Sequence, residues 1–261
     1  MPALAIAGEA EPPQKIGSTS LCGDSYVRAL LSDGTPGKIH ALSWQSRDPL
    51  SLASSAEQAL PQIWNDGETI IASGVDMVIL GPEFVGELDH MLYAAGINRA
   101  QIGWGEDFET LYTNIEILGE KLQVQDQAQH LKASLKSRLD ALPLPAEKYN
   151  ILYLAPAGFS AGPGTYIDAM ITAAGGENLN THPGWNKLDP EHLLILQPDL
   201  IVTGFADDSY ASINNLTKRH HAYAAFLNRS PRLDIAGALL PCVGPDLVIA
   251  TEQLNARLQE F

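Results

Sequence analysis

The chain has 261 residues, of which 45% are hydrophobic and 18% are charged. This is an ordinary globular composition, and the length suits two lobes of roughly 100 residues each with a connector. The 31 acidic and 16 basic residues give a formal net charge of -15. This acidic excess excludes a nucleic-acid-binding or anionic-membrane-binding surface as the basis of function. No apolar run approaches the roughly 20 residues that a membrane-spanning helix needs.

Residues 1–14 are expected to be the remnant of an export signal. Ala5-Ile6-Ala7 has the small-x-small pattern of a signal-peptidase site, and polar, proline-rich residues follow it. A basic segment and most of an apolar segment are missing, so a simple disordered N-terminus is the alternative.

Residues 15–106 are predicted to form an N-terminal α/β lobe. Short apolar strands alternate there with helical stretches, which is the rhythm of helices packed on a parallel or mixed sheet. Strands are expected over 15–21, 38–44, 75–81 and 101–105, and helices over 24–31 and 85–95. Gly96 then follows as a left-handed helix stop.

Residues 107–142 are predicted to be a helical spine between the lobes. The segment has no proline and is rich in Leu, Glu, Lys, Gln and Ala. One helix of about 30 residues would run about 45 Å. The alternative is two consecutive helices broken near Gly119.

Residues 143–261 are predicted to form a second, C-terminal α/β lobe. Strands are expected over 150–156 and 199–205, and helices over 166–174 and 190–196. GFSAGPG (158–164) lacks the Lys-Ser/Thr ending of a phosphate loop and is interpreted as a ligand-facing turn.

A repeat links the two lobes. ETIIASGVDMVIL (68–80) and EHLLILQPDLIVT (191–203) both open with Glu, place Asp eight residues later and finish on an apolar strand. The helix dipole favours each glutamate by about 0.3–1 kcal/mol. It does not explain why Glu68 and Glu191 have matched places in both halves.

Motifs for catalysis and metal binding are missing from the sequence. There is no nucleophile elbow and no His-Glu-x-x-His pair, so we assign no catalytic residue and no metal ligand. His220 and His221 are adjacent and would point in different directions on a helix, which favours a surface pair, although contact of one imidazole with a bound metal stays open. Cys22 and Cys242 are expected to be two isolated buried thiols, and their pairing is left open.

Aromatic residues gather at predicted strand ends and in the loops beyond them, where open α/β sheets place their ligands. They are Trp44, Trp64, Trp104, Phe159, Trp185 and Phe205. Trp44 and Trp185 are the strongest candidates for contact with a large flat ligand, because each lies in a loop. The alternative for each of them is a place in the core.

Together these segments resemble the substrate-binding proteins of the cobalamin and ferric-siderophore import family, whose lobes are joined by a long helix. The resemblance covers almost the whole chain and is carried by KIGSTSLCGDSYVRALL (15–31), ALSW (41–44), ETIIASGVDMVILGPE (68–83), GTYIDAMITAAGGENL (164–179), GWNKLDPEHLLILQPDLIVTG (184–204) and LLPCVGPDLVIATEQL (239–254). One departure is Gly74-Val75-Asp76, where the family usually has Lys-Pro-Asp.

The resemblance implies two Rossmann-like α/β lobes with a ligand cleft between them. It implies a periplasmic, monomeric solute-binding protein of an ABC importer, without a cofactor of its own, that delivers a bulky metal chelate to a permease dimer. The chelate would be a corrinoid, a ferric siderophore or haem. The alternatives are a chelatase-like enzyme on a related two-lobe fold and a sensory binding protein that meets no transporter.

Site residues follow from the same resemblance. Glu68 and Glu191 match the glutamates that dock on the permease. The cleft candidates are Cys22, Ser43, Trp44, Pro82, Phe159, Trp185 and Phe205.

Overall fold

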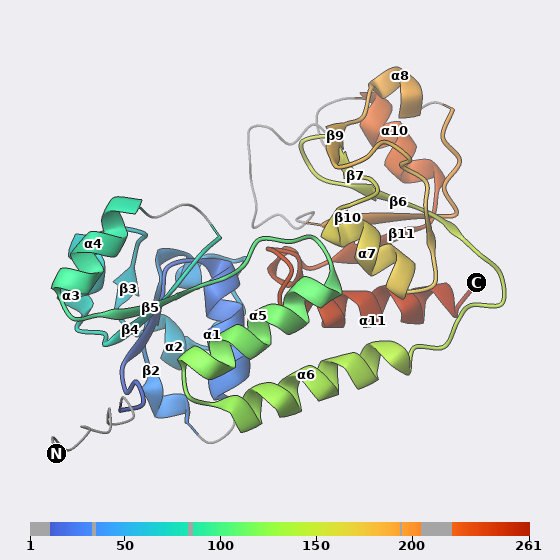
Figure 1. Cartoon of the computed structure of the whole chain (residues 1–261). Coiled ribbons are helices and arrows are strands. Elements are labelled where there is room, and N and C mark those ends of the chain that lie inside the picture. Colours follow the sequence, from blue (N-terminus) through green and yellow to red (C-terminus); the bar gives the residue numbers. More distant parts are fainter. Residues whose placement is uncertain (1–10, 33–34, 83–85, 194, 205–220) are drawn as a thin grey trace, which may run out of the picture.

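A computed structural model gives the architecture of the chain and describes residues 11–32, 35–82, 86–193, 195–204 and 221–261. Two lobes stand side by side, each built on a parallel sheet with helices packed against it (Figure 1). This confirms the prediction of a two-lobe α/β fold. No helix in the described ranges is long and apolar enough to cross a membrane.

The N-terminal lobe contains a five-stranded parallel sheet in the order β3-β2-β1-β4-β5. Its strands are β1 (Ile16–Ser18), β2 (Ile39–Ser43), β3 (Gln62–Ile63), β4 (Met77–Leu80) and β5 (Asn98–Gln101). Its helices are α1 (Leu21–Leu31), α2 (Ser55–Gln58), α3 (Gly67–Ser73) and α4 (Gly86–Ala94), with short 3-10 turns η1 (Pro36–Lys38) and η2 (Trp44–Arg47).

Strand β4 shows why this lobe has two cores. Met77 and Ile79 pack into a cluster with α1, whereas Val78 and Leu80 pack into a second cluster on the opposite face of the sheet. Successive side chains of a strand point to opposite faces, and a parallel sheet covered on both faces buries them all. The continuous apolar run of β4 is the sequence signature of that position.

The C-terminal lobe contains a four-stranded parallel sheet in the order β11-β10-β6-β8. Its strands are β6 (Asn150–Leu154), β8 (Glu177–Asn178), β10 (Leu200–Gly204) and β11 (Arg232–Ile235). A separate antiparallel pair joins β7 (Phe159–Ala161) to β9 (Trp185–Lys187). The helices are α7 (Tyr166–Ala173), α8 (Pro190–Leu193), α10 (His221–Arg229) and α11 (Asp246–Leu258), with the 3-10 turn η3 (Gly237–Leu239).

The connector is a helical hairpin, so the prediction of one helix over 107–142 is wrong. Helix α5 (Phe108–Lys121) packs antiparallel to α6 (Gln125–Asp140), and Lys132 of α6 reaches Glu116 of α5 at 2.5 Å (Figure 1). The chain reverses at Gln123, whose φ of 54° is left-handed. The alternative of two consecutive helices broken near Gly119 is confirmed, with the break after Lys121.

Helix α6 is the long helix that joins the lobes. It packs against α1 of the N-terminal lobe and against α11 of the C-terminal lobe. At its end, Arg138 donates two hydrogen bonds to Glu252 of α11, at 2.7 and 2.6 Å. This bidentate geometry fixes α6 on the C-terminal lobe.

Two further expectations are wrong. The strand expected at 101–105 lies earlier, at Asn98–Gln101, and residues after it are irregular. Cys22 and Cys242 are not isolated thiols but form a disulfide across a sequence separation of 220. The packing of the segment that leads into α11 explains the second error, because Val243 and Val248 pack into the core around α1 and bring Cys242 next to Cys22.

Candidate functional site

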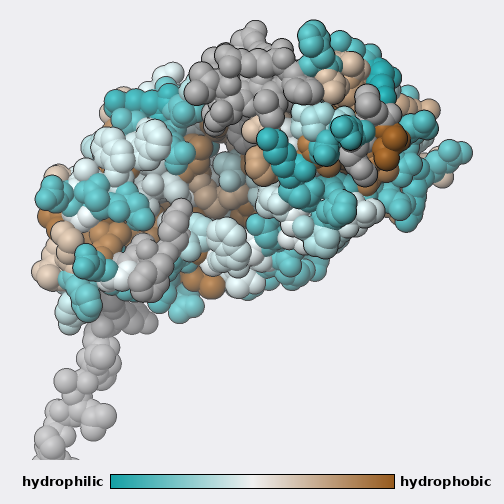
Figure 2. Space-filling model, turned by 90° about the horizontal axis from the view of Figure 1, so that it is seen from above, coloured by the Kyte–Doolittle hydropathy of each residue, from teal (hydrophilic) through white to brown (hydrophobic). Residues whose placement is uncertain are grey.

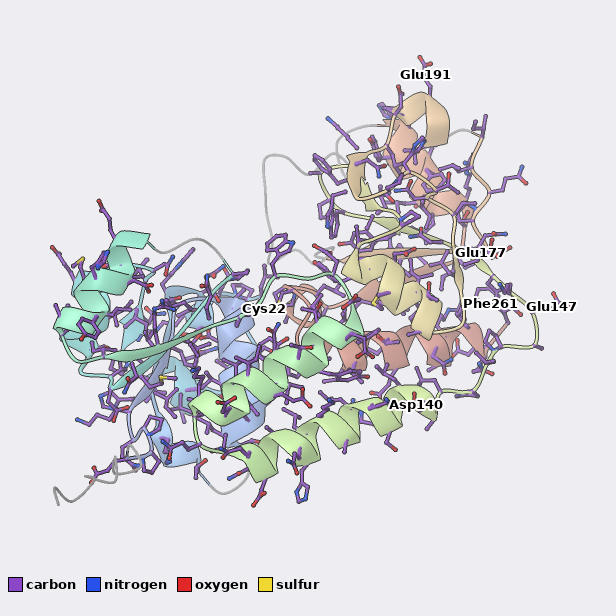
Figure 3. All side chains as sticks on the ribbon, viewed as in Figure 1. Cys22, Asp140, Glu147, Glu177, Glu191 and Phe261 are labelled. Atoms are coloured by element: carbon purple, nitrogen blue, oxygen red, sulfur yellow. A yellow bond between two sulfur atoms is a disulfide. The ribbon has the colours of Figure 1, made fainter. Side chains whose placement is uncertain are left out.

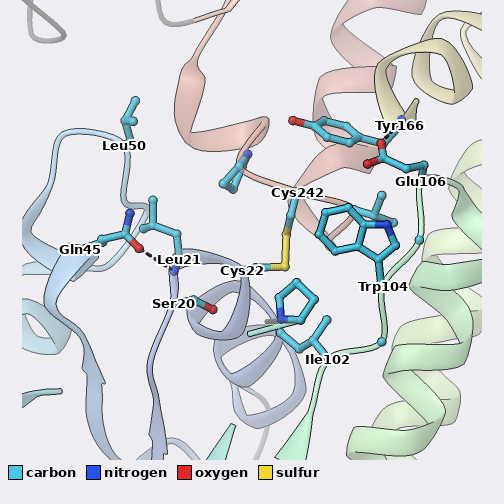
Figure 4. A pocket seen from close by; sticks show the side chains of 15 residues that line it. Ser20, Leu21, Cys22, Gln45, Leu50, Ile102, Trp104, Glu106, Tyr166 and Cys242 are labelled. Atoms are coloured by element: carbon cyan, nitrogen blue, oxygen red, sulfur yellow. Dashed lines mark hydrogen bonds between the residues drawn. A yellow bond between two sulfur atoms is a disulfide. The ribbon is translucent and has the colours of Figure 1, made fainter. Parts of the chain in front are cut away.

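A cavity of about 430 Å³ lies between the two lobes. From above, the surface is hollowed between the lobes, with hydrophobic side chains visible inside the hollow (Figure 2). The described residues around the cavity are Ser20, Leu21, Cys22, Gln45, Leu50, Pro82, Ile102, Gly103, Trp104, Gly105, Glu106, Tyr166, Pro241, Cys242 and Val243 (Figure 4). Most of them are apolar, and Glu106 carries the one charged side chain among them.

The sheet of the N-terminal lobe positions one wall of the cavity. Ser20, Gln45, Pro82 and Ile102 follow the carboxyl ends of β1, β2, β4 and β5, respectively. Parallel strands bring their carboxyl ends to one edge, which is where open α/β sheets bind ligands. The cavity therefore lies where proteins with this architecture bind their ligands.

Residues 102–106 form part of the cavity wall, and Asn114 of α5 fixes their backbone by hydrogen bonds. Asn114 of α5 accepts a hydrogen bond from the Gly103 amide at 2.8 Å and donates one to the Gly103 carbonyl at 3.1 Å. Trp104, which follows Gly103 in the chain, exposes 77% of its surface. A large exposed indole on a fixed backbone offers a flat apolar face to a ligand at little entropic cost.

Glu106 and Tyr166 connect the segment 102–106 to the second lobe. The Glu106 carboxylate accepts a hydrogen bond at 2.9 Å from the Tyr166 amide at the start of α7. The Tyr166 hydroxyl donates to the Leu240 carbonyl at 2.9 Å, and burial raises the pKa of Tyr166. Tyr166 is thus a neutral hydrogen-bonded wall of the cavity at ordinary pH.

Trp185 supports Tyr166 from the C-terminal lobe. Its ring centroid lies 5.6 Å from that of Tyr166 and 6.0 Å from that of Tyr153, the latter at an edge-to-face angle. Such pairs add about 0.5–1.5 kcal/mol beyond the area that they bury. Trp185 therefore stabilises the position of Tyr166, with 42% of its own surface still exposed.

The cleft candidates from the sequence fall in different places. Cys22 and Pro82 line the cavity. Ser43 is fully buried and donates its hydroxyl to Asp24 at 2.6 Å, so it does not reach the cavity. Trp44 is half-exposed in η2, outside the residues that line the cavity.

The remaining candidates belong to the C-terminal lobe. Phe159 is half-exposed on β7, and β7 pairs with the β9 strand of Trp185. Phe205 and His220 lie outside the described residues. His221 is the exposed first residue of α10. No group of three or more His, Cys, Asp or Glu side chains in the described ranges is placed to hold a metal ion.

Glu68 and Glu191 are both exposed, one on each lobe. Glu68 is in the first turn of α3, and Glu191 is in α8, at the outer end of the C-terminal lobe (Figure 3). Neither residue lines the cavity. Each lobe therefore presents one of the paired carboxylates on its own short helix.

Sequence reasoning did not select Gln45, Trp104, Glu106, Tyr166 and Cys242. Trp104 is one of the aromatic residues near predicted strand ends. Because β5 ends at Gln101, Trp104 lies in the loop beyond a strand end, which is where this architecture places its ligands.

Comparisons with known proteins agree with this geometry. The model of the family described as "Periplasmic binding protein" matches residues 65–230, more than half of the chain. A heme-binding periplasmic protein, HutB of Vibrio cholerae, superposes with a TM-score of 0.77 at 19% identity and covers 94% of this chain and 98% of its own. That similarity establishes the shared fold.

Two curated relatives match parts of the chain. A "Cobalamin-binding protein" of Halobacterium salinarum is 36% identical over 74 residues, or 26% of this chain and 20% of the relative. The "Uncharacterized ABC transporter substrate-binding lipoprotein YvrC" of Bacillus subtilis is 25% identical over 178 residues, or 61% of this chain and 53% of the relative. The matched segments thus span about half or less of these relatives. By its family match and its two-lobe architecture, the chain belongs to the periplasmic binding protein family.

Proposed function

We propose that this chain is the extracytoplasmic solute-binding protein of an ABC importer and that it captures a bulky metal chelate in the cavity between its lobes. The observation that carries the proposal is the cavity of about 430 Å³ at the carboxyl ends of the strands, with the exposed Trp104 in its wall. Its volume lies in the range of small-molecule sites. It would hold part of a chelate, with the remainder extending into the open cleft.

The ligand class is supported by chemistry and by relatives. The solved and curated relatives include proteins named for heme and cobalamin. In this chain, the polar side-chain groups among the described lining residues are the Ser20 hydroxyl, the Gln45 amide, the Glu106 carboxylate, the Tyr166 hydroxyl and the Trp104 indole N–H. A corrinoid suits these groups because its edge carries neutral amides. We therefore place corrinoids ahead of ferric siderophores and haem, and the metal would arrive within the ligand and not as a resident cofactor.

The partner and compartment complete the proposal. Glu68 and Glu191 would each pair with a basic residue of one permease subunit, so that a monomeric binding protein orients on a permease dimer. A disulfide between Cys22 and Cys242 suits an oxidising compartment such as the periplasm.

Tryptophan fluorescence tests the proposal. The protein is titrated with cyanocobalamin, haem and ferric siderophores, with correction for light absorbed by the ligand. We expect saturable quenching by one chelate with a submicromolar Kd. Trp104→Ala should weaken that binding by about ten- to a hundredfold, which is about 1.4–2.8 kcal/mol.

The matched control is Trp64→Ala, because Trp64 is a half-exposed indole that does not line the cavity. It should change the Kd by less than twofold. Absence of saturable binding to every chelate in the panel would reject a metal chelate as the ligand.

A further inference from the structure

The disulfide between Cys22 and Cys242 joins the two lobes at the cavity itself. Cys22 lies in the first turn of α1, where the lobes meet (Figure 3), and Cys242 lies in the segment between η3 and α11. Both residues line the cavity (Figure 4). A single covalent bond therefore forms part of the ligand cavity and connects its two sides.

Helix α1 makes two more contacts with the same segment. The Tyr26 hydroxyl donates to the Val243 carbonyl at 2.7 Å, and the Ser25 hydroxyl donates to the Asp246 carboxylate at 2.6 Å. Positions 22, 25 and 26 share one face of a helix, because residues three and four apart are neighbours. We name these three contacts, the disulfide and the two hydrogen bonds, the clasp.

The clasp lies on the cavity side of the molecule, and the lobes are also connected by α6 and by the hydrogen bond from the Tyr166 amide to Glu106. Helix α6 packs on α1 and α11, and Arg138 pairs with Glu252. Without the clasp, the lobes would be held by α6 and by the hydrogen bond between Tyr166 and Glu106, and they could rotate about the ends of α6. With the disulfide in addition, the path through α6 becomes a covalently closed ring, which restrains such rotation.

We propose that the Cys22–Cys242 disulfide sets the spacing between the two walls of the cleft and that both cysteines are positioning residues for the ligand. A cavity whose walls are already spaced for the ligand loses less freedom on binding, and this gain appears as affinity. The effect on lobe spacing depends on the clasp alone, whereas the effect on affinity rests on the proposed function.

Lobe spacing is measured first, without ligand. Spin labels are attached to cysteines introduced at Glu87 of α4 and Lys187 of β9, two exposed positions on different lobes. Pulsed electron resonance then gives the distance distribution in a protein with the disulfide intact and in Cys22→Ser/Cys242→Ser. We expect the double variant to have a distribution at least twice as wide. An unchanged distribution would overturn the proposal.

Affinity is measured second, with cyanocobalamin as the probe and with the chelate that quenches best in the panel. We expect Cys22→Ser/Cys242→Ser to bind at least tenfold more weakly than the oxidised protein. Wild-type protein that is folded first, then reduced with a phosphine and freed of reductant under argon, should show the same loss. The reduced wild-type protein provides the measurement if the double variant does not fold.

Ile201→Ala is the control for general destabilisation. Ile201 is fully buried in β10, in the core cluster with Leu193 and Tyr223 and away from the cavity. It should lower the thermal midpoint but leave the Kd within twofold. Equal losses of affinity in the control and the double variant would overturn the positioning role. If the oxidised protein binds no chelate, the proposed function fails, while the spin-label distances still decide the role of the clasp.

Discussion

Asp24 is a buried carboxyl group whose ionisation opposes folding. Burial raises its pKa from 3.8 to about 6, although hydrogen bonds from the Ser43 hydroxyl and amide and the charge of Arg28 act in the opposite direction. Because the folded pKa is the higher one, the folded state holds the proton more tightly than the unfolded state. The free energy of unfolding therefore falls as pH rises from about 3.8 to about 6.

We expect Asp24→Asn to remove this dependence. The stability difference between the variant and the wild type should shift in favour of the variant by roughly 3 kcal/mol between pH 3.5 and pH 7, because each pKa unit corresponds to 1.36 kcal/mol. Urea unfolding at intervals across this range measures it. A difference that stays constant with pH would show that Asp24 does not carry the effect.

Single residues mark the limit of what the sequence predicts. Ser43 was placed in the cleft by resemblance, yet its hydroxyl is bound to Asp24, 19 residues earlier in the chain. Cys22 and Cys242 are separated by 220 positions and meet because the segment after Cys242 packs on the first lobe. Neither contact can be recognised from a local sequence pattern, because both depend on tertiary packing.

At the scale of elements, the hairpin of α5 and α6 depends on Gly119. A Cβ atom at this position would lie 2.3 Å from the Cβ of Ala128, so the two helices approach closely only without a side chain there. We expect Gly119→Val to destabilise the fold by about 1–3 kcal/mol through overpacking. The measurement is the midpoint of chemical unfolding.

Glu120→Val is the matched control for Gly119→Val. Glu120 is exposed on the same helix, so the variant carries the same β-branched residue without the clash. It should cost well under 1 kcal/mol. Equal destabilisation by the two variants would show that the close approach of Gly119 to Ala128 does not control stability.

Central strands were predictable and edge elements were not. β4, β6 and β10 are continuous apolar runs because each is covered on both faces, and each was placed within two residues at either end. β5 lies at the edge of its sheet, and its sequence Asn-Arg-Ala-Gln has no apolar run. Strands as short as β3 and β8 likewise carry too few residues for a pattern.

At the scale of the whole molecule, Glu68 and Glu191 test the transporter partner. We expect Glu68→Lys/Glu191→Lys to reduce uptake of the chelate by cells at least tenfold, because both proposed ion pairs with the permease become repulsive. The Kd for the chelate should stay within twofold, since neither residue lines the cavity. Uptake assays in cells that lack the native chain, paired with fluorescence titration, measure both.

Glu87→Lys/Glu177→Lys has the same change of charge at other exposed positions of the two lobes and is the control. Uptake that is unaffected by reversal of Glu68 and Glu191 would show that these two glutamates do not dock the protein on the permease. An equal loss in the control would point to net charge and not to docking.

The two-lobe arrangement could be predicted because the strand–helix rhythm occurs twice, with the matched segments 68–80 and 191–203. The cavity could be predicted only in part. Its first wall follows strand ends that are visible in the sequence, whereas Tyr166 and Val243 reach it from the other lobe. Those contacts depend on how the lobes pack together, and the periodic pattern of apolar residues in the sequence does not predict that packing.

The ring closed by the disulfide has a consequence for resistance to proteolysis. A single cut anywhere between residues 22 and 242 leaves two fragments that remain covalently joined, because the bond spans 220 positions. Since most residues of the core clusters lie within that span, a nicked molecule keeps both halves together. Only a second cut, or reduction of the bond, would let a fragment diffuse away.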